Sequence, residues 1–301
     1  MKVFVAGGSG AIGIPLVRAL VAAGHDVTAL TRSAGKRDAL RRIGATPAIA
    51  DALNLESLRA ALEQARPTHV IHQLTAIPKE GPKRASDMDA TNRLRIDGTR
   101  NLLDASIRAG ARRFIVGSFA GLNLSARLPA SVDATAAAVR SMESQVLEAS
   151  RSGSIEGVVL RYGLFYGPDN PATLKMVELI RRRWLPIIRG DSGQLPLIYV
   201  DDAVAATIAA LDRAPAGAVY DIVDDRAVSM SEVVRTIAEY THSAYPISVP
   251  AWVPRLVSPY MAQMMSMRVP LSNAKAKAEL GWRPAHATLR EGLSSMFARA
   301  A

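Results

Sequence analysis

The chain has 301 residues, nearly half of them apolar, which is enough to bury a large core in one or two domains and argues against disorder. It contains no Cys, which excludes disulfides, thiolate nucleophiles and Cys-ligated metal sites. The formal net charge is +10, from 37 Lys and Arg against 27 Asp and Glu, but the basic residues are scattered and not interleaved with aromatic ones, so no nucleic-acid partner is expected.

The first element is a short apolar run, residues 3–6, which ends at Gly7 and predicts a buried parallel strand rather than a signal peptide. Residues 11–23 place apolar side chains at helical spacing, with Pro15 in the first turn and Gly24 at the end. No apolar run reaches the length of a membrane span. We therefore expect a cytoplasmic protein with no membrane partner.

Strands and helices then alternate along the chain. Further strands are predicted at residues 27–30, 48–50, 70–74, 113–116 and 158–161, with helices at 53–65, 92–109 and 135–149. This alternation predicts an α/β fold, a Rossmann-type doubly wound parallel sheet with helices on both faces. After Tyr166 the pattern changes to turns, prolines and short elements, which indicates a smaller lobe.

A glycine-rich loop connects the first strand to the first helix. Gly7, Gly10 and Gly13 have the spacing G-x-x-G-x-x-G, in which the glycines allow a tight turn, a close approach to a pyrophosphate and close helix–strand packing. The helix N-terminus, which includes Ala11 and Ile12, offers backbone amides to an anion. The sequence therefore predicts a dinucleotide site here; the alternative is a glycine-rich turn that binds nothing.

The end of the second strand indicates which dinucleotide is preferred. A site for NAD usually has an acidic residue there, which binds the ribose 2′-hydroxyl. This chain has Arg32, and its acidic Asp26 lies at the opposite end of the strand. A guanidinium favours a 2′-phosphate, so NADP(H) is the preferred cofactor and NAD(H) remains possible. The alternative for Arg32 is an exposed residue on a basic surface.

Further cofactor contacts are predicted where strands three and four end. Asp51, followed by Ala52, can accept a hydrogen bond from the adenine amino group, or it can be the N-cap of the next helix. Gln73, Leu74 and Thr75 end strand four at the edge of the sheet where cofactors bind in this fold.

Together these motifs resemble the extended short-chain dehydrogenase/reductase superfamily, also called the NAD-dependent epimerase/dehydratase family. Beyond the glycine loop, the similar stretches are residues 95–118, 160–168, 195–206, 219–225 and 272–284. The resemblance runs nearly end to end. It implies an NAD(P)-binding domain over residues 1–165, to which residues 195–225 return, and a smaller substrate-binding lobe formed by residues 166–194 and 226–301.

The chain departs from this family at the residues that carry its chemistry. The usual proton donor is a Tyr in the motif Y-x-x-x-K, where the Lys lowers the pKa of the Tyr. These two positions fall at Thr135 and Val139. The chain is therefore most similar to atypical members that bind the cofactor but lack the standard Tyr–Lys pair.

Three residues are candidate catalytic groups. Ser118, after the candidate cofactor residue Gly117, lies at or next to the family's catalytic Ser/Thr position, or else caps a strand end. Tyr162 and Tyr166 could lie against the nicotinamide and the substrate, or pack between the lobes. Bound water or the substrate itself are the other routes for a proton. The five His residues have no metal-ligand spacing, so no metal is expected.

These observations favour an NAD(P)-dependent oxidoreductase that transfers hydride between nicotinamide and a small or medium organic substrate with a carbonyl, imine or enone group. The alternatives are a non-catalytic protein that senses NADP(H) and a nucleotide-sugar epimerase or dehydratase. The resemblance also implies a homodimer, paired through the helices at 92–109 and 135–149. Residues 250–267 are rich in adaptable apolar side chains, four of them Met, which fits an apolar ligand, a lobe core or a subunit contact.

Overall fold

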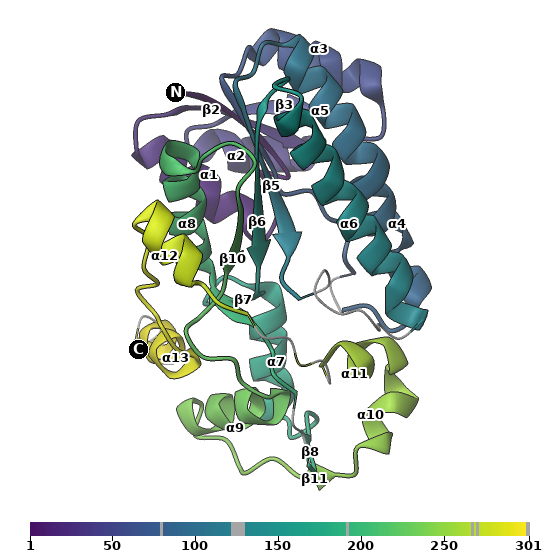
Figure 1. Ribbon diagram of the computed structural model, residues 1–301. Helices are drawn as coiled ribbons and strands as arrows, with labels where there is room; N and C mark the ends of the chain where they lie inside the picture. The colour runs from purple at the N-terminus through teal and green to yellow at the C-terminus, as the bar shows by residue number, and fades with distance from the viewer. Residues whose placement is uncertain (79–80, 122–129, 191–192, 266–267, 269–270, 299–301) are drawn as a thin grey trace.

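The computed structural model describes residues 1–78, 81–121, 130–190, 193–265, 268 and 271–298 (Figure 1). Its centre is a parallel sheet of seven strands in the order β10-β6-β5-β4-β1-β2-β3. The strands are β1 (Lys2–Ala6), β2 (Asp26–Thr31), β3 (Thr46–Ile49), β4 (His69–His72), β5 (Arg113–Phe119), β6 (Glu156–Tyr162) and β10 (Val219–Ile222). This order is that of a doubly wound sheet, which confirms the predicted α/β, Rossmann-type fold.

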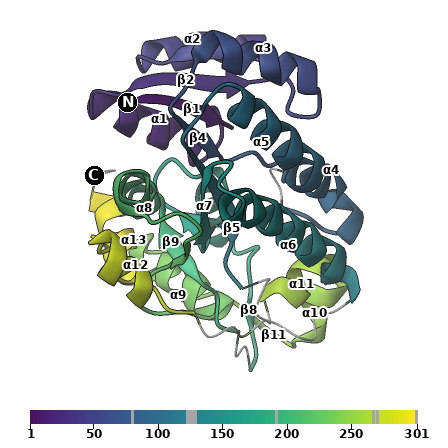
Figure 2. The same cartoon turned by 45° about the horizontal axis from the view of Figure 1, so that its top comes forward.

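Helices cover both faces of the sheet (Figures 1 and 2). One face carries α3 (Leu55–Ala65), α5 (Thr99–Arg108) and α6 (Ala130–Arg151). The other carries α1 (Gly13–Ala22), α8 (Val200–Arg213) and α12 (Ala274–Leu280). The short 3-10 helix η1 (Ala34–Lys36) and α2 (Arg37–Arg42) connect β2 to β3.

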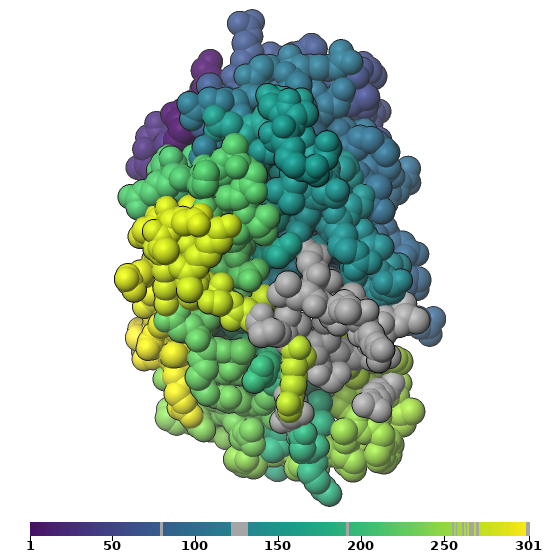
Figure 3. Space-filling view, in the orientation of Figure 1, coloured from purple at the N-terminus to yellow at the C-terminus, as the bar shows by residue number. Residues whose placement is uncertain are grey.

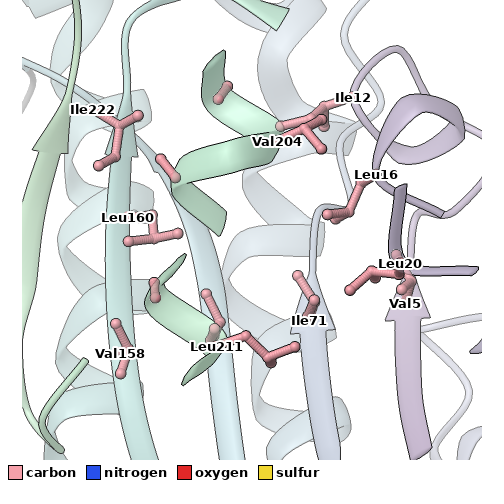
Figure 4. Close-up of a cluster of buried hydrophobic side chains, with 14 of the residues drawn as sticks. Val5, Ile12, Leu16, Leu20, Ile71, Val158, Leu160, Val204, Leu211 and Ile222 are labelled. Atoms are coloured by element: carbon pink, nitrogen blue, oxygen red, sulfur yellow. The ribbon is translucent and has the colours of Figure 1, made fainter. Parts of the chain in front are cut away.

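The strands bury side chains on both faces because successive residues of a strand point to opposite sides. In β1, Val5 packs on the side of α1 and α8, together with Leu16, Ile71 and Leu160 (Figure 4). Its neighbour Phe4 packs on the side of α3, α5 and α6. Two hydrophobic cores therefore hold the sheet between its helix layers.

The helix predicted over residues 92–109 begins earlier and is interrupted. It consists of the 3-10 turn η2 (Ala85–Met88), α4 (Asp89–Arg93), the π-helical stretch η3 (Leu94–Gly98) and α5. A π-helical stretch inserts an extra residue into a turn and occurs frequently at functional sites. Here it contains the buried side chain of Arg95.

The second lobe has its own small core, which includes Tyr166, Tyr199, Val234 and Leu293. Its elements are β7 (Leu164–Tyr166), α7 (Pro171–Arg181), β8 (Ile187–Ile188), β9 (Leu197–Tyr199), α9 (Met230–Tyr240), β11 (Ser248–Val249), α10 (Trp252–Val257), α11 (Pro259–Met265) and α13 (Leu289–Ala298). The C-terminal segment, yellow in Figure 3, lies on the green surface that includes α8. The domain bounds given above stay a prediction. Within the described ranges, no helix has the length and apolar character needed to cross a membrane.

Candidate functional site

Two of the three loop glycines, Gly7 and Gly13, occupy positions between β1 and α1 where a side chain does not fit. Gly7 has a φ of +89°, and a Cβ on it would lie 2.7 Å from the carbonyl oxygen of Gln73. A Cβ on Gly13 would lie 2.1 Å from the carbonyl oxygen of Gly7, to which the N–H of Gly10 donates at 2.9 Å. Ile12 is the N-cap of α1 and forms no side-chain cap hydrogen bond, and the first turn of the helix has no acidic residue. This bare, positive helix end fits the pyrophosphate of a dinucleotide.

The loop after β4 lies directly against the glycine loop. Gln73 continues β4 and donates its N–H to the carbonyl of Ala6 at 2.8 Å. Leu74 donates its N–H to Nδ1 of His72, and Thr75 is exposed. Strands β1 and β4 are neighbours where the strand order of the sheet reverses, which is where doubly wound sheets bind their ligands.

The basic side chain of Lys36 contacts the glycine loop close to the end of β2. The Oγ1 atom of Thr31 is 3.2 Å from Oγ of Ser9 and accepts the N–H of Ser33. Nζ of Lys36 donates to the carbonyl of Ser9 at 3.4 Å, and Arg32 is exposed between these residues along the chain. The end of β2 therefore brings positive charge to the loop.

Asp51 and the buried Ala52 follow β3. One oxygen of Asp51, Oδ1, accepts the N–H of Leu53 at 3.0 Å. The N-cap of α3 is Asn54, whose side chain accepts the N–H of Ser57. The alternative role of Asp51 as the N-cap is therefore wrong, because the helix starts two residues later than predicted. The contact of Asp51 with adenine stays a prediction.

Tyr162 ends β6 and its hydroxyl is fully engaged inside the protein. It accepts a hydrogen bond from Nε2 of Gln73 at 3.1 Å. It lies 2.7 Å from Oγ1 of Thr207, which donates its own proton to the carbonyl of Ala203, so Tyr162 is the donor to Thr207. Burial raises the pKa of Tyr162 to about 12. A Cβ on Gly117 would lie 2.2 Å from Oε1 of Gln73, so these residues of β5, β6 and the loop after β4 form one contact group.

The side chain of Ser118 points toward α6, on the face of β5 opposite to the one where Gly117 contacts Gln73. Its hydroxyl donates to Oε1 of Glu143 at 2.5 Å. Arg161 of β6 donates to both oxygens of Glu143, with Nη2 2.7 Å from Oε2. Asp221 of β10 lies near this pair, and its burial raises its pKa. The network ties together two strands and α6.

Tyr166 lies in the core of the second lobe. Its hydroxyl donates to Oδ2 of Asp224 at 3.0 Å, and its ring packs edge-on against Tyr199. Burial, followed by the charge of Asp224, raises the pKa of Tyr166, and burial raises the pKa of Asp224 to about 7. The hydroxyls of the three predicted catalytic residues thus bind three different sets of partners. Their catalytic roles stay predictions.

The face of α6 at which the standard Tyr and Lys positions fall is buried. Thr135 and Val139 have exposed fractions of 2% and 0%. Tyr260 of α11 donates its hydroxyl proton to Oγ1 of Thr135 at 3.1 Å. Met264, also of α11, packs against the hydrophobic cluster that contains Val139 and Tyr260. In the sequence, Tyr260 belongs only to the apolar segment 250–267, and no local pattern indicates a hydrogen bond to Thr135, 125 residues away. Residues 266 and 267 of that segment lie outside the described residues.

His72 is a neutral side chain of the sheet rather than a ligand. Its Nδ1 accepts the N–H of Leu74, and its Nε2 is 3.0 Å from Oγ1 of Thr99. Burial, with a smaller effect from the positive charge of Arg95, lowers the pKa of His72 to about 4. In the part of the chain that the structure describes, no three His, Asp or Glu side chains gather into a possible metal site.

The sheet order and the glycine loop define a Rossmann-type dinucleotide-binding protein. The family model for the NAD dependent epimerase/dehydratase family matches residues 3–223, and the chain belongs to this family. This result confirms the resemblance seen in the sequence.

Relatives with described activities include reductases and epimerases. The chain is 34% identical to a 3-diazoavenalumate denitrifying reductase of Streptomyces, over 97% of this chain and 99% of the relative. It is 26% identical to a ceramide reductase of Caulobacter vibrioides, over 98% and 90%. The structure of UDP-glucose 4-epimerase from Thermus thermophilus in complex with NAD has a TM-score of 0.80 and 25% identity, and covers 99% of this chain and 98% of its own. These matches bear out the prediction of an NAD(P)-dependent oxidoreductase.

Proposed function

We propose that the chain is a reductase that uses NADPH to reduce an electrophilic organic substrate without a proton from a Tyr–Lys pair. The observation that carries this proposal is the buried face of α6, where Thr135 and Val139 stand in place of that pair. When bound, the coenzyme supplies the hydride, and the protein supplies position and a dry environment. Epimerisation through transient oxidation of a sugar requires a base at this position, so the missing pair disfavours it.

The hydrogen bonds of the predicted proton donors support the same conclusion. Ser118 donates to Glu143, Tyr162 donates to Thr207, and Tyr166 donates to Asp224. Each of these protons already has an acceptor inside the protein. A substrate whose reduction needs no protein-derived proton matches such a site best.

We therefore propose an organic diazonium ion as the substrate. The relative at 34% identity is described as a denitrifying reductase of a diazo compound, and it aligns with 97% of this chain. The balanced reaction is R–N₂⁺ + NADPH → R–H + N₂ + NADP⁺, in which the C–N bond breaks, a C–H bond forms, and no proton is taken up or released. The protein's task is then to hold the reacting carbon against the coenzyme and to keep water away.

NADPH is the proposed coenzyme because Lys36 contacts the glycine loop and Arg32 directly follows the neighbouring strand β2. Arg32 is exposed directly after β2, and Lys36 binds the carbonyl of Ser9 in the loop. An additional phosphate on the adenosine ribose would be bound by these charges, whereas NADH offers only a neutral hydroxyl there.

The experiment is a turnover assay with isotope-labelled coenzyme. Purified protein is mixed with NADPH carrying deuterium at C4 and with a substituted benzenediazonium salt, and the arene product is analysed by mass spectrometry. The proposal predicts protein-dependent NADPH oxidation and one deuterium in the arene. NADPH binding without turnover of diazonium, aldehyde, ketone or enone substrates would favour the coenzyme-sensing alternative, and conversion of UDP-glucose would favour an epimerase.

A homodimer paired through α5 and α6 also stays a prediction. Analytical ultracentrifugation tests it directly, because a dimer of this chain has twice the mass of 32.1 kDa.

A further inference from the structure

A positively charged side chain is buried in the π-helical stretch η3. Arg95 has an exposed fraction of 7%, and its one hydrogen bond within the described residues runs from Nη1 to Oδ1 of Asn92 at a long 3.4 Å. No carboxylate of the described residues forms an ion pair with it. A guanidinium has five N–H donors, so most of its capacity is not used by these partners.

This arrangement is unfavourable for the protein alone. Burial lowers the pKa of Arg95 to about 10, which reflects the cost of removing the charge from water. A buried charge normally has an ionic partner, because an uncompensated one destabilises the fold. Among the described residues, the other buried arginine, Arg113, pairs with Glu156, and the partly buried Arg161 pairs with Glu143. Arg95 is the exception among the described residues.

The surroundings of Arg95 combine hydrogen-bonding groups with apolar walls. Nδ2 of Asn92 is 3.5 Å from Oγ1 of Thr135, which also accepts the hydroxyl of Tyr260. The apolar part of the cluster consists of Met88, Val132, Ala136 and Val139, with Phe119 and Met264 packed against it. Three segments meet here: the interrupted helix, α6 and α11.

This cluster lies beside the candidate cofactor site. Phe119, the last residue of β5, is paired in register with Tyr162 of β6, whose hydroxyl binds Gln73 after β4. Nε2 of His72, at the end of β4, is 3.0 Å from Oγ1 of Thr99, the residue that directly follows η3, and the positive charge of Arg95 contributes to the lowered pKa of His72. Arg95 therefore lies near the carboxyl ends of the central strands, where the reacting groups of ligands lie in doubly wound sheets.

We propose that Arg95 binds the carboxylate of the substrate, with Thr135 and Tyr260 alongside it and the apolar cluster around the rest of the molecule. This inference rests on the proposed reductase function and names its substrate class: an apolar molecule that ends in a carboxylate. The planar guanidinium matches a carboxylate through two parallel hydrogen bonds. A carboxylate carries one negative charge, which a single guanidinium compensates, whereas a diphosphate carries more than one.

The test measures ligand-induced thermal stabilisation in the presence of saturating NADPH. The probes are cinnamate and its uncharged methyl ester, with UDP-glucose as the diphosphate. The variants are Arg95→Met and Arg95→Lys, and the control is Arg93→Met, which removes an exposed arginine two residues away. NADPH affinity is measured separately for each variant by coenzyme fluorescence.

We expect cinnamate, but not its ester, to raise the Tm of the wild type and of Arg93→Met. The shift should disappear in Arg95→Met and be reduced in Arg95→Lys, with NADPH affinity changed less than about threefold, since Arg95 is not among the residues proposed to bind the coenzyme. Without ligand, Arg95→Met should have the same Tm as the wild type or a higher one, because it removes an uncompensated buried charge.

Three results would overturn the proposal. The first is a cinnamate shift that is absent in the wild type or equal in Arg95→Met. The second is a ligand-free Arg95→Met protein that unfolds at a clearly lower temperature or does not fold, which would make Arg95 a structural residue. The third is stabilisation by UDP-glucose that depends on Arg95. Failure of the wild type to bind NADPH would instead contradict the proposed function, and is measured independently of Arg95.

Discussion

Ser118 and Glu143 are joined by a hydrogen bond of 2.5 Å between a strand and a helix, and the same carboxylate is held by the guanidinium of Arg161. The Glu143 side chain has an exposed fraction of 5% and that of Arg161 has 19%. This pair is therefore much less screened by solvent than the other ion pairs of α6, such as Arg151 with Glu148. Ser118 acts here as a donor to a carboxylate, which binds β5 to α6.

Replacing Glu143 should destabilise the protein. In Glu143→Gln the guanidinium of Arg161 loses its buried anion, and breaking such a pair costs about 3 kcal/mol. The matched control is Glu148→Gln, whose exposed pair contributes less than about 1 kcal/mol. Urea denaturation followed by circular dichroism measures both. Equal stabilities of the two variants would contradict the importance of this network.

The glycine loop gives a sharp test of coenzyme binding. Gly13→Ala should weaken NADPH binding by more than about tenfold, because its Cβ would meet the carbonyl oxygen of Gly7 at 2.1 Å and displace the loop. Gly98→Ala is the control, since the nearest atom to its added Cβ is 3.4 Å away. Fluorescence titration with NADPH distinguishes them. Unchanged affinity in Gly13→Ala would place the coenzyme elsewhere.

The preference for NADPH depends on Arg32 in our proposal. Arg32→Ala should raise the Kd for NADPH about tenfold, equivalent to about 1.4 kcal/mol, and leave the Kd for NADH unchanged. Arg42→Ala, in α2, removes the same charge farther along the chain and serves as the control. If Arg32→Ala affects both coenzymes equally, the residue does not recognise the 2′-phosphate.

Asp224 should make stability depend on pH. The folded chain has a raised pKa of about 7 at this buried carboxyl, whereas the unfolded chain releases the proton near pH 4. Folding therefore takes up a proton between these values, and the free energy of unfolding falls as the pH rises. Between pH 5 and pH 8 the free energy of unfolding of the wild type should fall by about 2 kcal/mol more than that of Asp224→Asn. Urea denaturation at a series of pH values measures both proteins. The same dependence of the unfolding free energy on pH in the two proteins would contradict this prediction.

Tyr162→Phe tests whether a protein-derived proton is needed. The variant keeps the ring but loses the hydroxyl that binds Gln73 and Thr207. For a diazonium substrate, kcat should stay within about threefold of the wild type, while stability falls by about 1 kcal/mol. Stopped-flow measurement of NADPH oxidation gives the rate. A loss of more than about a hundredfold would identify Tyr162 as the proton donor.

The parts of this structure that the sequence predicted well depend on local signals. Short apolar runs define the six predicted strands, and the spacing of Gly7, Gly10 and Gly13 predicts the tight connection between β1 and α1. Helix α3 begins two residues later than the sequence predicts, because Asp51 and Asn54 are both residue types that cap a helix N-terminus. Backbone geometry decides between them, and it is not visible in the residue types.

The chemistry of the site depends on contacts that no local pattern contains. The hydrogen bond between Tyr260 and Thr135 joins distant parts of the chain, and Arg95 is buried within a π-helical stretch. An arginine in a helix is normally exposed, so its residue type alone predicts the wrong environment. The partner of Ser118, Glu143, is likewise defined by the packing of α6 on β5.

Asp202, at the start of α8, accepts hydrogen bonds from the backbone N–H groups of Ala285 and His286, and Trp282 donates its indole N–H to the carbonyl of Asp202. Helix α8, which covers one face of the central sheet, is thus held in place by residues at least 80 positions downstream. During synthesis on the ribosome, this face stays incomplete until almost the entire chain has emerged. A nascent chain interrupted before Trp282 would have an open hydrophobic core and be a substrate for chaperones or proteases.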